Sequence, residues 1–126
     1  MVTHKKLILL VEDHVFFRMD ITELLTNSGF DVLDANNAIE AMSLLNLGNN
    51  RVDLLFTDVQ LPGGLDGVEL AHYFRSCFPL KPILVSSGKI DITAEDLPIG
   101  SRFIRKPFGA EFVLSHIEEL ISLNPG

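Results

Sequence analysis

The sequence contains no tryptophan, and it has only one tyrosine and one cysteine among its 126 residues. A single cysteine can form neither a disulfide framework nor a cysteine-rich metal site. Cys77 falls within a helical pattern, and we expect it to be an ordinary structural thiol. The cysteine content therefore excludes disulfide-stapled domains and cysteine-based zinc sites.

Long apolar runs are also absent. The longest uninterrupted run, Leu7 to Val11, is far short of the roughly 18 residues that a membrane span requires. The N-terminal stretch from Met1 to Lys6 carries two lysines, but only the five apolar residues of that run separate it from Glu12 and Asp13, so no secretory signal is visible. We therefore expect a soluble, cytoplasmic protein that does not associate with membranes.

Positive charge is scarce. Ten basic residues face 17 acidic ones, which gives a formal net charge of −7, and no basic patch stands out. This balance opposes unaided binding to the phosphate backbone of nucleic acid. A chain of this length buries a single core, so residues 1–126 are expected to form one domain.

Short apolar runs and helical patterns alternate along the chain. The runs have the length of strands and occupy Leu7–Val11, Val32–Leu33, Val52–Phe56, Ile83–Val85 and Phe103–Ile104. Runs that are apolar throughout are typical of strands buried on both faces. The pattern predicts an α/β protein whose parallel sheet carries helices on both sides.

The clearest helix is the last one, because apolar residues recur there with helical spacing at Val113, Ile117, Leu120 and Ile121. An earlier helix is predicted over Val15–Ser28, with Gly29 placed to terminate it. Another should begin at Asn37, whose side chain can cap it, while Glu40 supplies the partner of a capping box.

Polar residues follow the predicted strands at the point where each strand ends. They are Glu12 and Asp13, then Asp58, then Ser86 and Ser87, and finally Lys106. Ligands of open parallel sheets bind at the carboxyl ends of the strands, so all of these residues should meet at one edge. Taken singly, each has an ordinary alternative: an acidic residue can cap the next helix, and a lysine can simply face water.

Together these residues indicate a site for phosphoryl chemistry. Three carboxylates in close proximity repel one another by about 4 kcal/mol per pair at 4 Å with an effective dielectric near 20, so they call for a cation. Oxygen ligands without histidine or thiolate favour Mg²⁺. Asp58 is best placed to attack phosphorus, while Lys106 and the hydroxyl of Ser86 complete a socket of phosphate size.

Four motifs, each behind its own strand, make the chain resemble the receiver domains of two-component response regulators. They are Val11-Glu12-Asp13, Thr57-Asp58-Val59-Gln60-Leu61-Pro62 with Asp66-Gly67, Val85-Ser86-Ser87-Gly88, and Arg105-Lys106-Pro107-Phe108. The resemblance covers residues from about 6 to 123. It implies a doubly wound, flavodoxin-like sheet of five parallel strands in the order 2-1-3-4-5.

The resemblance also implies a function. A phosphohistidine, on a sensor histidine kinase or a histidine phosphotransfer protein, would donate its phosphoryl group to Asp58. Mg²⁺ would be held by Asp13, Asp58 and the main-chain carbonyl of Gln60, with Glu12 acting through water.

Other expectations from the resemblance concern how the signal is produced. Ser86 and Phe103 would form the conformational switch that signals to a downstream protein not identified by the sequence. Gln60 and Ser87 would tune the lifetime of the phosphoryl group, and the Lys106–Pro107 bond would be cis.

Departures from the usual receiver pattern lead to further expectations. Pro98 and Gly100 interrupt the segment that normally holds the fourth helix, so that helix should be short or irregular. Phe103 stands where tyrosine is common, and Gly63-Gly64 should form a tight bend. His14 is interpreted as a surface helix residue rather than a ligand.

Three other functions were weighed. A haloacid-dehalogenase-like hydrolase would place a second aspartate two residues after the first, where this chain has Gln60. A flavodoxin-like nucleotide or flavin carrier would require a glycine-rich phosphate loop, which is absent. A receiver-shaped module that is never phosphorylated is disfavoured by the full set of site residues. The sequence does not exclude a receiver cut from a larger regulator or hybrid kinase.

Overall fold

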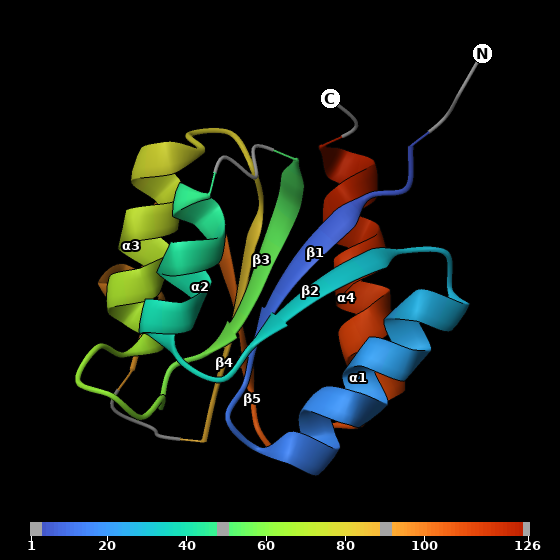
Figure 1. The fold of residues 1–126 in the computed structure, drawn as a ribbon, viewed down its shortest axis with the longest axis horizontal. Helices are drawn as coiled ribbons and strands as arrows, with labels where there is room; N and C mark the ends of the chain where they lie inside the picture. The colour runs from blue at the N-terminus through green and yellow to red at the C-terminus, as the bar shows by residue number, and fades with distance from the viewer. Residues whose placement is uncertain (1–3, 48–50, 89–91, 125–126) are drawn as a thin grey trace.

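The computed structural model describes residues 4–47, 51–88 and 92–124. Five parallel strands form one sheet in the order β2-β1-β3-β4-β5 (Figure 1), which confirms the expected topology. The elements are β1 Leu7–Val11, α1 Val15–Asn27, β2 Asp31–Ala35, α2 Ala38–Asn46, β3 Val52–Asp58, α3 Gly67–Cys77, β4 Ile83–Ser87, η1 Ala94–Asp96, β5 Ser101–Arg105 and α4 Ala110–Leu123.

Strand β1, which lies between β2 and β3, is buried on both faces, which explains its unbroken apolar sequence. Leu7, Leu9 and Val11 face the layer formed by α2 and α3, where they join a cluster that includes Phe74. The intervening residues face the opposite layer, formed by α1 and α4. Figure 1 shows the sheet between these two pairs of helices, as the sequence predicted.

Helix caps fix the turns at the carboxyl edge of the sheet. The Asn37 side chain accepts a hydrogen bond from Glu40 N at 2.8 Å, which confirms the predicted cap. The predicted capping box is not formed. Glu40 Oε1 accepts a hydrogen bond from the backbone N–H of Asn36, one residue before the cap residue Asn37. A complete capping box occurs instead at the start of α3, between Asp66 and Glu69.

The first helix begins and ends close to prediction. His14 is the N-cap residue of α1, and its Nδ1 accepts a hydrogen bond from Phe17 N at 3.3 Å. It is exposed, as predicted, but it lies just outside the helix. Gly29 follows the helix with φ 96°, a conformation that favours glycine. Gly63 and Gly64 also have positive φ, at 97° and 92°, as a tight bend requires.

The connection between β4 and β5 contains no α-helix in its described residues. It forms only the three-residue 3-10 helix η1, which confirms the expectation of a shortened element; residues 89–91 lie outside the described part. The buried Leu97 packs into the same cluster as Phe74. His72 on α3 contacts the carbonyl of Asp96 at 2.9 Å, which fastens η1 to the neighbouring helix.

Four of the predicted strands, β2 to β5, extend further than their apolar runs, and for β3 and β4 the extension includes site residues. Asp58 is the last residue of β3, and Ser86 and Ser87 are the last two residues of β4, so these polar side chains belong to the strands instead of following them. Cys77 ends α3 and is exposed. The Lys106–Pro107 bond is cis, as expected. Within the described part of the chain, no helix has the length and apolar character needed to cross a bilayer.

Candidate functional site

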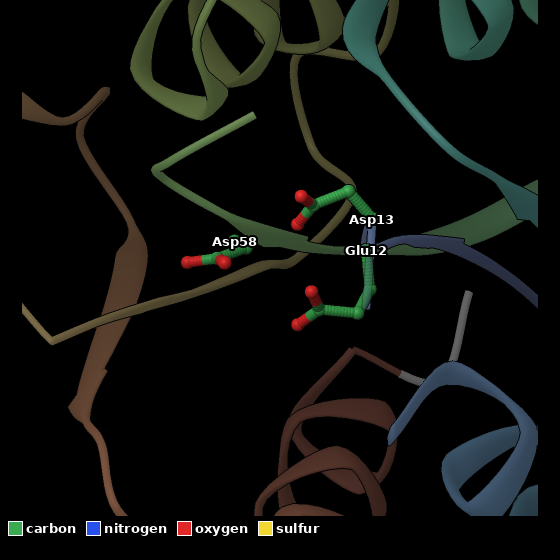
Figure 2. Close-up of side chains that lie close together, drawn as sticks. All are labelled: Glu12, Asp13 and Asp58. Carbon is green, nitrogen blue, oxygen red and sulfur yellow. The ribbon is translucent and has the colours of Figure 1, made fainter. Parts of the chain in front are cut away.

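Three carboxylates converge where the two central strands end. Glu12 and Asp13 follow β1, and Asp58 ends β3, the strand paired with it. One carboxylate oxygen from each lies within 4.8 Å of the others. Figure 2 shows the three side chains turned toward one region in front of the strand ends. The parallel sheet thus brings together residues that are 45 positions apart in sequence.

The site is partly buried, and its charged groups lie close together. Glu12 is 3% exposed and Asp58 is 5% exposed, whereas Asp13 faces solvent. Burial raises the pKa of the Glu12 carboxyl; the hydrogen bond from His14 N and the positive charge of Lys106 oppose this rise, and the charge of Asp58 adds to it. An ionised Glu12 is therefore costly in this position.

Lys106 is the cation of the site. Its Nζ donates to Asp58 Oδ2 at 3.0 Å and to Glu12 Oε1 at 3.3 Å. Burial acts to lower the pKa of Lys106, but its hydrogen bonds and its attraction to the two carboxylates outweigh burial, so the pKa is raised. The ammonium also lies 5.6 Å from the centre of the Phe17 ring. Lys106 consequently stays charged near neutral pH.

Two polar atoms at the centre of the site have no partner. Asp58 Oδ1 and Ser86 Oγ are both buried without a hydrogen bond. Such atoms are nearly always paired in folded proteins, and exceptions often mark places where a ligand or ion binds. Asp58 and Ser86 are opposite each other in the β3–β4 register, so both open atoms belong to one location.

The remaining predicted residues surround this centre at different depths. Gln60 is exposed and, with Asp13, lines a cavity of about 560 Å³. The buried Ser87 uses its carbonyl to accept from Lys106 N at 3.0 Å, which anchors the lysine. Phe103 lies on β5 opposite Val85, half-buried, with the Arg105 guanidinium 5.3 Å from the centre of its ring.

Gly67 supports the site, although its role was not predicted. It begins α3, and a Cβ atom there would lie 1.9 Å from the Asp58 carbonyl oxygen. Its N–H donates to Val59 O at 2.7 Å. Only glycine allows α3 to start this close to the strand that carries Asp58. The Asp66-Gly67 pair was the available sequence signal, but the close contact itself depends on the tertiary fold.

Comparisons with known proteins agree with this geometry. A family model described as the response regulator receiver domain matches residues 8–118. The chain belongs to that family. It is thus a receiver domain of a two-component system, which is a phosphoacceptor signalling module rather than a conventional enzyme. Its acidic pocket of Glu12, Asp13 and Asp58 is consistent with a phosphoacceptor site.

Individual relatives support the assignment. The chain is 31% identical over 117 residues to the sensor kinase CckA of Brucella abortus, covering 90% of the chain and 12% of that protein. It is 32% identical over 117 residues to the response regulator MprA of a Mycobacterium species, covering 90% of the chain and 50% of MprA. The receiver therefore spans half or less of these two relatives.

A solved relative shows the same architecture. The crystal structure of a response regulator receiver protein from Sinorhizobium medicae superposes with a TM-score of 0.85 at 26% identity, covering 94% of this chain and 95% of that one. The likeness therefore extends to nearly the whole of both chains. Membership of the receiver family, and not the shared fold, excludes the hydrolase and flavodoxin-like alternatives.

We expect Gly67→Ala to destabilise the receiver, because the added methyl group would collide with the Asp58 backbone. Overpacking of this kind costs about 1–3 kcal/mol or more of the free energy of unfolding. Urea denaturation of the native chain and the variant measures the difference. Gly88→Ala is the matched control, since a Cβ at Gly88 meets nothing within 4 Å. Equal stabilities for Gly67→Ala and the native receiver would contradict the steric account.

Proposed function

We propose that this receiver is a phosphorylation switch in which Asp58 accepts a phosphoryl group from a phosphohistidine in a Mg²⁺-dependent reaction. The donor is a sensor histidine kinase or a histidine phosphotransfer protein. One observation carries the proposal: the two carboxylate oxygens of Asp58 differ in their contacts. Oδ2 accepts a hydrogen bond from Lys106, whereas the buried Oδ1 has no hydrogen-bond partner. The open oxygen is the one available for reaction.

In the proposed reaction Asp58 Oδ1 attacks the phosphorus atom. A P–O bond forms, the P–N bond to the donor imidazole breaks, and the imidazole nitrogen retains the electron pair of that bond. Lys106 then contacts a phosphoryl oxygen as a compact cation, and the open hydroxyl of Ser86 donates to another. Both groups already lie beside Asp58, so little rearrangement is needed to form the socket.

The residues fit a magnesium ion. Three carboxylates whose oxygens lie within 4.8 Å of one another form the hard-oxygen donor set that this ion prefers. Asp13, Asp58 and the Gln60 carbonyl would hold the ion, with Glu12 acting through water. When bound, Mg²⁺ supplies positive charge that offsets repulsion between the aspartate and the phosphoryl group.

The signal leaves the site through Ser86 and Phe103. Ser86 lies on β4 next to β5, where Phe103 is half-buried, so a displacement of the hydroxyl toward the phosphoryl group alters the space available to the ring. Two arrangements that differ by a few kcal/mol suffice, provided that the phosphoryl group contacts only one of them. The target of the switch is a downstream protein.

We also propose that residues 1–126 form one receiver domain with its core at about 6–123, acting in the cytoplasm. The family match over residues 8–118 and the net charge of −7 support a protein partner over nucleic acid. No membrane association is proposed.

Intact mass after incubation with acetyl phosphate tests the central proposal. The native receiver is expected to gain one phosphoryl group only when Mg²⁺ is present, and Asp58→Asn should gain none, because the nucleophilic carboxylate is lost. Asp53→Asn provides the matched control, since Asp53 lies on the same strand at its other end. Absence of any gain by the native chain would favour a receiver-shaped module that is never phosphorylated.

Apolar side chains exposed around the site suit a docking partner. Phe16 and Met19 on α1 are 74% and 59% exposed, and Phe112 on α4 is also exposed. Beside them, a cleft of about 300 Å³ is lined by His14, Phe17, Lys106, Pro107 and Phe108, so it leads to the active lysine. Exposed apolar groups next to a reactive centre favour an apolar helix face of the histidine-bearing donor as the contact.

This surface predicts a separation of two activities. Phe16→Ala combined with Met19→Ala should slow transfer from a phosphorylated histidine kinase by roughly tenfold or more, because docking loses buried apolar area. Phosphorylation by acetyl phosphate should stay unchanged. The kinase is any member of a purified panel that phosphorylates the native receiver, and radiolabel transfer is the readout. Leu80→Ala, at another highly exposed position, is the control. Equal slowing with both donors would contradict a docking role.

Gln60 and Ser87 are proposed to set the lifetime of the aspartyl phosphate. Gln60 is exposed at the wall of the 560 Å³ cavity, on the side from which water approaches, so replacing it with arginine or alanine should change the dephosphorylation rate several-fold. Ser87→Ala should have a smaller effect, because its side chain is buried. Loss of radiolabel over time measures both rates. Unchanged rates in both variants would rule out this assignment.

A further inference from the structure

Arg18 on α1 spans three acceptors behind the acidic site. Its Nη1 donates to the Glu12 carbonyl oxygen at 2.7 Å and also to Asn36 Oδ1, while its Nε pairs with Asp34 Oδ2 at 3.2 Å. The side chain is only 16% exposed. Asp34 belongs to β2 and Asn36 to the turn after it, so Arg18 joins the end of β2 to the turn that carries the acidic pair.

The contact with the Glu12 carbonyl has a geometric consequence. This carbonyl belongs to the peptide group that connects Glu12 to Asp13, so its orientation governs the direction of both side chains. Glu12 is held in addition by His14 N and by Lys106. Among the described residues the Asp13 carboxylate has no hydrogen bond or ion pair, so the backbone, which sets the direction of its Cα–Cβ bond, is the one constraint on this side chain.

We propose that Arg18 is a positioning residue for Mg²⁺: by holding the Glu12–Asp13 peptide it presents the Asp13 carboxylate toward Asp58. This inference rests on the proposed function, because it concerns the ion which that function requires. Arg18 does not touch the reacting atoms. It acts through the backbone, as groups behind metal ligands commonly do, and the loss of such a group typically weakens metal binding by about 10–100-fold.

A plain surface ion pair would contribute much less, and the chain offers one for comparison. Arg51 pairs with Asp31 at 3.2 Å and donates to the Lys5 carbonyl at 3.3 Å. It thus has the same kinds of partner, an aspartate of β2 and a main-chain oxygen. However, Arg51 is 54% exposed and lies at the opposite end of β2. Exposed pairs of this kind have little energetic effect.

Calorimetric titration of Mg²⁺ into the full chain, without any phosphoryl donor, tests the inference. Arg18→Met should raise the Kd for Mg²⁺ by about tenfold or more. Arg18→Lys should also bind weakly, because one ammonium cannot reproduce a planar fork that reaches three acceptors. Arg51→Met should bind as the native chain does. Asp34→Asn removes the ion pair of Arg18 without altering α1, and it should raise the Kd for Mg²⁺ at least twofold. This variant tests the inference if Arg18→Met fails to fold.

A second readout separates positioning from general damage. In phosphorylation by acetyl phosphate, Arg18→Met should need more Mg²⁺ for half-maximal rate but recover the native rate at saturating Mg²⁺. A native Kd for Arg18→Met, or full recovery of affinity by Arg18→Lys, would overturn the inference. Native protein that neither binds Mg²⁺ nor gains a phosphoryl group would instead overturn the proposed function itself, so the two failures are distinguishable.

Discussion

Mutual repulsion among three carboxylates is the constraint around which the receiver is organised. Glu12, Asp13 and Asp58 bring oxygens within 4.8 Å of one another, although two of these side chains are nearly excluded from water. Without the constraint of the fold, these three carboxylates would move apart, because like charges repel. Backbone hydrogen bonds of neighbouring strands prevent separation, and Lys106, which follows β5, neutralises part of the charge. The sheet therefore holds an arrangement that favours the arrival of a cation.

The structure around Asp58 differs from that of the β4–β5 connection. Asp58 ends a strand that is buried on both faces, and Gly67 lets α3 begin directly against it, so the backbone of Asp58 has little freedom. The described residues of the β4–β5 connection contain only the 3-10 helix η1, where a full α-helix could lie. Ser86 and Phe103 lie on these two strands. A local change at Asp58 can thus reach the edge of the sheet through few intermediate contacts.

Most strands and three of the helices could be predicted because they left local signals, whereas the strand order was implied by the resemblance to receivers. Continuous apolar runs marked strands covered on both sides, and Gly29 marked the end of α1. Strand boundaries were less accurate: Ser86 and Ser87 were expected beyond β4 but complete it, because backbone pairing continues past the apolar residues. Likewise, Glu40 was assigned to the wrong cap contact, because the choice between two adjacent N–H groups depends on turn geometry.

The sequence by itself determined the chemical character of the site. It places carboxylates at the ends of the first and third strands, a hydroxyl at the end of the fourth and a lysine after the fifth. In any parallel sheet of this order, these groups meet at one edge. The tertiary structure alone decided which oxygen of Asp58 stays open, how close Gly67 must approach and that Arg18 holds the Glu12 carbonyl. These features depend on distances between segments remote in sequence, and local patterns carry no information about such distances.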